Sequence, residues 1–138
     1  MKLTTRLTGK RKAAMNGKLV DTNILIYLSQ KKLPLNKIAD RNVKLYISVI
    51  TYMEALGYPF RNQDEQLLME RICAVFEIIQ IEQAIVDQVI HIRRLHKVKL
   101  PDAIILATAT TSKLDLITAN INDFQGINDS TTLINPMG

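Results

Sequence analysis

The chain has 138 residues, of which 47% are hydrophobic and 22% are charged, as expected for a soluble globular protein of one domain. No apolar run is long enough to cross a membrane, and the single cysteine, Cys73, excludes an internal disulfide and predicts a buried thiol in a reducing, cytoplasmic compartment. The net charge of +5 equals the charge of residues 1–14 alone, so it does not indicate a basic surface on the rest of the chain.

Strands and helices are expected to alternate along residues 15–138. Short apolar segments predict strands at 18–21, 45–47, 76–81, 116–118 and 131–134. Helical periodicity and capping residues predict helices at 22–28, 35–40, 49–56, 62–75, 82–97 and 101–112. This alternation predicts an α/β fold in which helices cover both faces of a mainly parallel sheet.

The first 14 residues are expected to lie outside this domain. They contain five basic and no acidic side chains and show no apolar periodicity. We expect a disordered tail or a non-native extension, with a nucleic-acid-binding arm as the alternative.

Four acidic side chains stand in otherwise apolar stretches: Asp21, Glu54, Asp102 and Asp123. Three of them follow predicted strands or open predicted helices, which is where ligand sites gather in parallel sheets. Each acid taken alone is also explained as a helix cap, but the four together favour a metal site. Ligands that are all oxygen atoms suit Mg²⁺, with Mn²⁺ as a substitute.

Four sequence segments resemble the motifs of the PIN-domain superfamily, and within it the VapC-type toxin endoribonucleases. They are Leu19-Val20-Asp21-Thr22-Asn23, Ile47-Ser48 to Thr51 and Glu54, Leu100-Pro101-Asp102-Ala103, and Thr118-Ala119-Asn120 with Asp123-Phe124. The resemblance implies a three-layer α/β/α PIN-like fold over nearly all of residues 15–138. It also implies Mg²⁺-dependent hydrolysis of RNA by the toxin of a toxin–antitoxin pair, inhibition by a cognate antitoxin, and a homodimer.

The same resemblance implies roles for individual residues. Asp21 and Asp102 would be direct metal ligands, Glu54 would bind metal or orient its water, and Asp123 would complete the site. Thr22 and Asn23 would support these acids, and Asn120 stands where some relatives carry an acid. For Ser48 and Thr51, helix capping and backbone hydrogen bonding are the favoured explanations.

Four basic residues precede Asp102 and are candidates for binding RNA phosphates: Arg93, Arg94, Lys97 and Lys99. The alternative is that they complement the dipole at a helix C-terminus. The two histidines, His91 and His96, have no partners at metal-ligand spacing and are expected at the surface.

The helix predicted at 62–75 has more apolar residues than one face needs. We expect Leu67, Leu68, Ile72 and Val75 on its inner face and Met69 in a groove for an antitoxin helix, the alternative being burial of the whole helix in its own domain. The competing functions are a non-catalytic RNA- or protein-binding PIN-like module, for which an acid should be lost, and a phosphatase or phosphoacceptor built on Asp21. A phosphatase of the haloacid-dehalogenase type is disfavoured because position 23 is Asn where a second Asp is needed, and a receiver-type phosphoacceptor is disfavoured because the Lys it needs near the last strand is absent.

Overall fold

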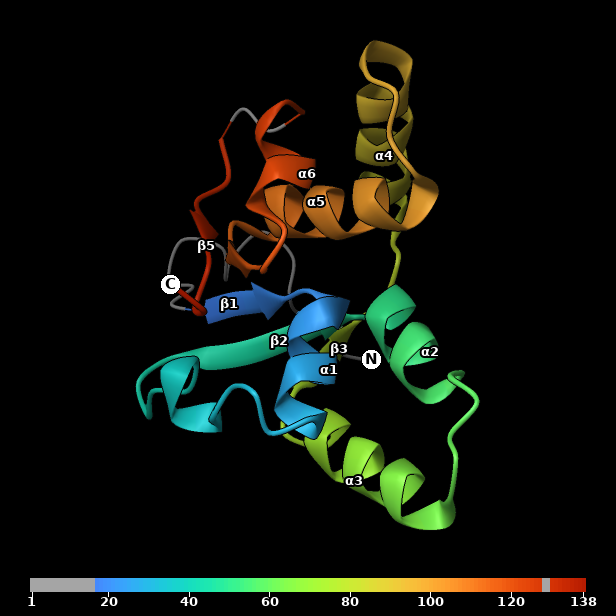
Figure 1. The fold of residues 1–138 in the computed structure, drawn as a ribbon. Coiled ribbons are helices and arrows are strands. Elements are labelled where there is room, and N and C mark those ends of the chain that lie inside the picture. Colours follow the sequence, from blue (N-terminus) through green and yellow to red (C-terminus); the bar gives the residue numbers. More distant parts are fainter. Residues whose placement is uncertain (1–16, 128–129) are drawn as a thin grey trace.

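A computed structural model describes residues 17–127 and 130–138 (Figure 1). The tail predicted at residues 1–14 lies outside the described residues. The strands are β1 (Gly17–Val20), β2 (Lys44–Ser48), β3 (Glu77–Ile79), β4 (Asp115–Ile117) and β5 (Leu133–Ile134). The helices are α1 (Thr22–Ser29), a 3-10 turn η3 (Leu35–Lys37), α2 (Val49–Leu56), α3 (Gln63–Cys73), α4 (Gln83–Leu95), α5 (Leu100–Ser112) and α6 (Ile121–Gln125).

The five strands form one sheet in the order β3-β2-β1-β4-β5, and every neighbouring pair is parallel. Helices α4, α5 and α6 lie on one side of the sheet and α1 and α3 on the other (Figure 1). The predicted three-layer α/β/α fold is therefore confirmed. Because all strands run in the same direction, their carboxyl ends share one edge, where β1 and β2 lead into α1 and α2.

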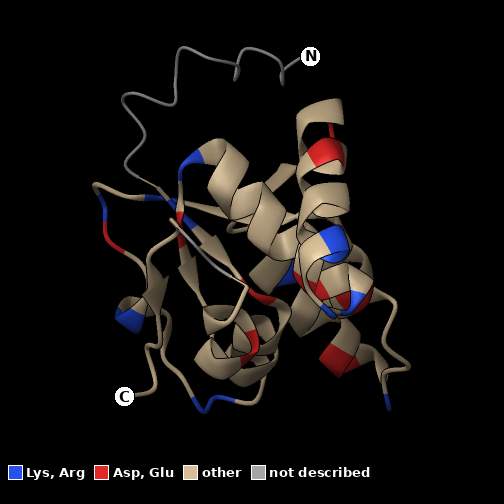
Figure 2. Ribbon diagram, turned by 90° about the horizontal axis from the view of Figure 1, so that it is seen from above, with Lys and Arg blue, Asp and Glu red and all other residues tan. Residues whose placement is uncertain are grey.

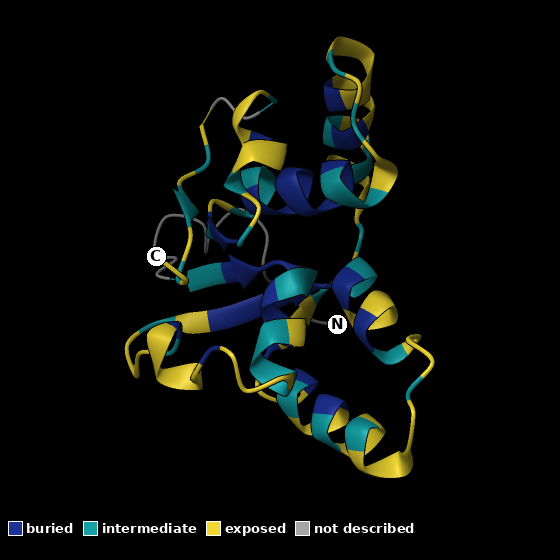
Figure 3. Cartoon of the chain, viewed as in Figure 1, coloured by how far each residue is buried: buried dark blue, intermediate teal, exposed yellow. Residues whose placement is uncertain are grey.

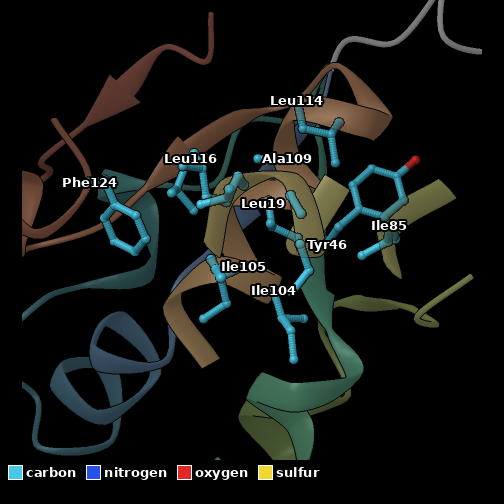
Figure 4. Packing of buried hydrophobic residues seen from close by; sticks show 14 residues of the cluster. Leu19, Tyr46, Ile85, Ile104, Ile105, Ala109, Leu114, Leu116 and Phe124 are labelled. Carbon is cyan, nitrogen blue, oxygen red and sulfur yellow. The ribbon is translucent and has the colours of Figure 1, made fainter. Parts of the chain in front are cut away.

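Alternate residues of the central strand enter two separate cores. Leu19 packs into a cluster with residues of α4, α5 and α6, including Ile104, Ile105 and Phe124, as Figure 4 shows. Its neighbour Val20 points to the opposite cluster, which contains residues of α1 and α3. Both side chains are fully buried, as expected for a central strand covered on both faces.

Helix α2 has the predicted bounds because both of its ends are specified locally. The Ser48 hydroxyl accepts a hydrogen bond from the Ile50 N–H at 3.1 Å, and Gly57 follows the last residue of the helix. The Asn62 cap of α3 is also confirmed, since its side chain accepts from the Glu65 N–H at 2.9 Å.

The predicted inner face of α3 is wrong for Leu67 and Val75, whereas Leu68 and Ile72 are partly buried and Ile72 packs against the core. Leu67 and Val75 are 40% and 48% exposed, whereas Met69 and Cys73 are each only 4% exposed. Met69 and Cys73 are four residues apart and share the line that packs with α1, and Val75 lies beyond the end of the helix. Met69 is thus part of the core and does not form a groove for a partner, while Cys73 is buried as predicted and burial raises the pKa of its thiol.

Three other elements differ from the sequence predictions. The predicted helix 35–40 is only the short η3, and the predicted strand 76–81 is reduced to β3. Helix α6 was not predicted. Across the described residues we find no helix that is long and apolar enough to span a membrane.

Candidate functional site

Three of the four candidate acids follow neighbouring parallel strands. Asp21 directly follows β1, Glu54 lies on the helix after β2, and Asp123 lies in the first turn of the helix after β4. Asp102 lies in the first turn of α5, where the helix dipole favours a carboxylate. The sheet order places β1 between β2 and β4, so Asp21 is at the centre of the group.

Asp21 is held in a fixed orientation by three hydrogen bonds. Its carboxylate accepts from the Thr22 N–H at 2.8 Å, the Asn23 side chain at 3.2 Å and the Thr118 hydroxyl at 2.7 Å. Its own N–H donates to the Ile117 carbonyl at 2.9 Å. The residue is only 5% exposed. A carboxylate fixed in this way is preorganised for a ligand, since little side-chain freedom remains to be lost on binding.

Thr118 is a site residue whose role the sequence did not reveal. It is fully buried, and its hydroxyl accepts a hydrogen bond from the Asn120 N–H at 3.0 Å while it donates to Asp21. The only sequence signal was its place in the Thr118-Ala119-Asn120 segment. Its contact with Asp21 joins the ends of β1 and β4, so Thr118 links the central acid to the segment that leads to Asp123.

Glu54 is positioned by a threonine from the opposite side of the site. The Thr22 hydroxyl lies 2.7 Å from Oε1 of Glu54 and 3.0 Å from the hydroxyl of buried Thr51. Since Thr22 has one hydroxyl proton and a carboxylate only accepts, Thr22 donates to Glu54. Helices α1 and α2 are thereby connected at the site, and the Glu54 side chain itself remains exposed.

Asn23 connects Asp21 to the segment that follows β4. Its amide group donates to Oδ2 of Asp21, and its carbonyl oxygen accepts from the Ala119 N–H at 3.3 Å. The expected supporting role of Asn23 thus takes the form of a bridge between two loops. Asn120, in contrast, is exposed and makes no side-chain capping bond to α6.

The pKa directions show that the four acids act on one another. Burial is the main factor that raises the pKa of Asp21, hydrogen bonds from Thr118 and Thr22 oppose it, and the charges of Asp102 and Glu54 raise it further. Burial also raises the pKa of Asp102, as do the charges of Asp123 and Glu54, whereas Lys99 lowers it. Every predicted acid is therefore close enough to influence at least one of the others.

This negative charge is not neutralised by ion pairs. Within residues 17–127 and 130–138, the side-chain ion pairs are Lys44–Glu77 and Arg61–Glu65, and neither involves the four acids. No three His, Cys, Asp or Glu side chains in the same residues are close enough to form a ready-made metal cage. The four acids, spaced in this way, fit a hard cation such as Mg²⁺, which keeps several bound waters and takes only one or two carboxylates as direct ligands.

The four candidate RNA-binding cations separate into two groups. Lys99 is the N-cap residue of α5 and acts electrostatically on Asp102, and Lys97 is in the exposed segment before it. Arg93 and Arg94 lie in the last turn of α4 and line a mainly apolar groove between α4 and α5. Across the described residues, Lys and Arg are scattered over several segments and form no continuous basic stripe (Figure 2).

The two histidines lie toward the C-terminal end of α4, His91 within the helix and His96 directly after it. His91 is exposed and His96 is partly buried, in agreement with the surface or boundary positions expected for them. Both line a shallow hollow between α4, α5 and the end of α6. Among the described residues, neither histidine is one of the groups that shift the pKa of Asp21 or Asp102.

Comparison with known proteins gives a family match. A family model described as "PIN domain" matches residues 18–128. A search of curated proteins found no significant match.

Several solved structures are similar over most of the chain. A toxin–antitoxin complex from Klebsiella pneumoniae is 36% identical, with a TM-score of 0.68, and the match covers 86% of this chain and 97% of that one. VapBC-1 from nontypeable Haemophilus influenzae is 22% identical, with a TM-score of 0.73 and coverage of 88% and 99%. VapBC2 from Rickettsia felis, bound to a promoter DNA fragment, is 20% identical, with a TM-score of 0.72 and coverage of 85% and 96%.

Proposed function

Since the chain belongs to the PIN domain family, as its sequence motifs predicted, we propose that it is a metal-dependent endoribonuclease and the toxin of a toxin–antitoxin pair. The observation that carries this proposal is the buried Asp21 carboxylate, which lies within electrostatic range of Asp102 and Glu54 and has no cationic partner among the described residues. A buried carboxylate without a cationic partner, close to other acids, lowers the stability of the metal-free protein. A bound cation would offset this repulsion and stabilise the fold.

We propose a separate role for each acid and for the side chains that orient it. Asp21 and Asp102 hold the metal directly, because they are the two more buried acids. Glu54, oriented by Thr22, binds the metal or positions the attacking water, and Asp123 completes the negative set. Thr118 and Asn23 keep the Asp21 carboxylate in place.

When bound, Mg²⁺ or Mn²⁺ would supply positive charge at the scissile phosphate and lower the pKa of water. Attack of water on phosphorus with departure of the 3′ oxygen leaves a 5′-phosphate and a 3′-hydroxyl. Lys97 and Lys99 are proposed to bind phosphates of the RNA as it enters the acidic site. Arg93 and Arg94, in the last turn of α4, are proposed for the same role.

The proposed partners are RNA, a cognate antitoxin and a second copy of the chain, and the proposed location is the cytoplasm. Similarity to toxin–antitoxin complexes supports the antitoxin, particularly the match at 36% identity. An antitoxin cation, such as an arginine, placed between Asp21 and Asp102 would compete with the metal and switch off cleavage.

The experiment that tests this proposal is cleavage of single-stranded RNA by the purified chain. We expect cleavage with Mg²⁺ or Mn²⁺, no cleavage in EDTA, and products that carry 5′-phosphate and 3′-hydroxyl ends. Cleavage that EDTA leaves unchanged would refute the metal-dependent mechanism. Binding of RNA without cleavage in any divalent metal would instead favour the non-catalytic alternative.

A further inference from the structure

A hollow among the helices on one side of the sheet has no role in the proposed catalysis. It has a volume of about 200 Å³ and lies between α4, α5 and the end of α6. Figure 3 shows exposed residues on α4 and α6, on either side of the buried middle of α5. The lining includes the buried apolar residues Ile92 and Leu106 and the polar residues Gln88, His91 and His96. Apolar walls with a few polar groups are typical of a ligand pocket.

The described lining of the hollow contains no Lys, Arg, Asp or Glu. Within residues 17–127 and 130–138, no hydrogen bond occupies the side chains of Gln88, His91 or His96. A side-chain amide and a neutral imidazole each offer both a donor and an acceptor. The hollow therefore suits an uncharged ligand that has donors and acceptors at its edge and apolar faces.

The hollow adjoins the acidic site through two helices. Leu106 follows Asp102 by four residues on α5, so the two lie on the same side of that helix, about 6 Å apart along its axis. Helix α6 makes the second connection, because Asp123 lies in its first turn and Gly126, at its end, lines the hollow. The hollow therefore begins about one helical turn from the acids.

Two lysines lie between the hollow and the acids in the sequence. His96 lines the hollow, Lys97 follows it directly, and Lys99 caps α5 and acts electrostatically on Asp102. Lysine binds phosphate as a point charge. Single-stranded RNA has the matching chemistry, because charged phosphates alternate along the chain with uncharged bases that carry donors and acceptors.

From this arrangement we propose that the hollow binds one base of the RNA, from a nucleotide beside the scissile phosphate. The base edge would form hydrogen bonds with Gln88, His91 and His96, and its faces would lie on Ile92 and Leu106. Proteins recognise single-stranded RNA through unstacked bases held in this way. The volume suits a single base, since pockets for larger small molecules measure about 300–1,000 Å³. This subsite rests on the proposed nuclease function, to which it adds recognition of a base.

The two histidines make the hollow directly observable, because the chain contains no others. Their ring protons are followed by NMR of the full-length chain in EDTA, where the RNA should stay intact, during titration with a short single-stranded RNA. We expect the signals of both rings to shift and saturate. An abasic RNA of the same length keeps the phosphates and should leave these signals unshifted. The spectrum of His91→Ala assigns each signal to its ring.

Cleavage with Mg²⁺ tests whether the bound base belongs to the substrate. In a set of RNAs that each lack one base near the cleaved bond, one abasic position should lower the kcat/KM of the unmodified chain by about tenfold or more. Gln88→Ala/His91→Ala should lower kcat/KM on intact RNA by a similar factor and should no longer respond to that position. Gln66→Ala on the exposed side of α3 is the matched control and should behave like the unmodified chain.

A second variant, Gly126→Leu, obstructs the hollow without removing a polar group. The backbone of Gly126 is right-handed helical, and a Cβ added there would meet no atom within 4 Å, so the variant should fold. We expect it to lose the response to the same abasic position.

Either measurement can overturn the proposal. Ring signals that intact RNA leaves unchanged, or that abasic RNA shifts equally, would show that the hollow binds no base. Variants that respond to every abasic position as the unmodified chain does would show the same. If the antitoxin shifts the ring signals and RNA does not, the hollow belongs to the antitoxin. A chain that cleaves no RNA would refute the proposed function, and the NMR titration would then decide the role of the hollow by itself.

Discussion

The hydroxyl of Thr118 donates a 2.7 Å hydrogen bond to Oδ2 of Asp21, although the two residues are 97 positions apart in the sequence. The parallel register of β1 and β4 pairs Val20 with Ile117, so the next residue of each strand meets at the sheet edge. The central acid of the candidate site is thus oriented by sheet pairing as well as by its immediate neighbours Thr22 and Asn23.

Replacing Thr118 with Val should impair the site while largely preserving the fold. The new side chain has a similar size but cannot donate to Asp21 or accept from the Asn120 N–H. An unsatisfied buried polar group costs about 1–3 kcal/mol, so we expect a corresponding loss of stability. We also expect weaker metal binding and slower RNA cleavage.

Thr108→Val is the matched control for this substitution. Thr108 is also fully buried, but its hydroxyl donates to the Ile104 carbonyl within α5 and does not contact the acids. The comparison is made by isothermal titration with Mn²⁺ and by chemical unfolding. Equal effects of the two substitutions on metal affinity would show that Thr118 has only a structural role.

The metal-free protein should lose stability as pH rises through the mildly acidic range. Burial and neighbouring charges raise the pKa of Asp21 and of Asp102 above the ordinary value of 3.8. A raised folded-state pKa means that the protonated form contributes stability, which is complete below the unfolded-state pKa and is lost above the folded-state pKa.

Unfolding in EDTA at several pH values from about pH 3 to pH 8 measures this effect, because such a series begins below the unfolded-state pKa and continues to neutral pH. The decrease in the free energy of unfolding should be smaller in Asp102→Asn, which cannot ionise at that position. A variant that shows the full decrease of the unmodified chain would contradict the assignment of the effect to Asp102.

Divalent metal should stabilise the folded chain. A ligand that binds only the folded state adds about 2.7 kcal/mol when its free concentration is roughly a hundredfold above its dissociation constant. Thermal unfolding should therefore shift upward with Mg²⁺ or Mn²⁺. Asp102→Asn should be more stable than the unmodified chain in EDTA, since it removes one repelling charge, and should respond little to metal. A melting temperature that stays the same when millimolar metal is added would argue against a metal site.

Two substitutions on α3 should have very different effects on folding. Met69 is buried beside Cys73, whereas Leu67 on the same helix is 40% exposed. Met69→Asp should destabilise the protein by more than about 3 kcal/mol, because an unpaired charge enters the core. Leu67→Asp should be tolerated, and urea unfolding of both variants distinguishes them. A tolerated Met69→Asp would show that this side of α3 is accessible after all.

The elements that could be predicted from sequence are those with strong local signals. Helix α2 is bounded by Ser48 and Gly57, and β1 ends in the apolar pair Leu19-Val20, which the polar residue Asp21 directly follows. The positions of Asp21 after β1, Glu54 on α2 and Asp102 in the first turn of α5 were also predictable, whereas Asp123 was expected only after β4 and not on a helix. The alternation of the elements then determined the three-layer arrangement.

The features that could not be predicted depend on tertiary packing. Leu67, Leu68, Met69 and Ile72 surround much of α3, so the sequence offers several apolar faces, and packing against α1 selects the one with Met69 and Cys73. Thr118 looks like an ordinary strand residue until β4 pairs with β1. Helix α6 was missed because its polar start, Asn120 to Asp123, has the composition of a loop.

The most direct test of the central claim is the rate of RNA cleavage in Asp21→Asn compared with Asp115→Asn. Both substitutions replace an acid by its neutral amide, but Asp115 starts β4 at the opposite end of the strands from the acidic site. With Mg²⁺ present and both proteins folded, we expect no detectable cleavage by Asp21→Asn and an unchanged rate for Asp115→Asn. Cleavage by Asp21→Asn at the rate of the unmodified chain would contradict the assignment of catalysis to this site.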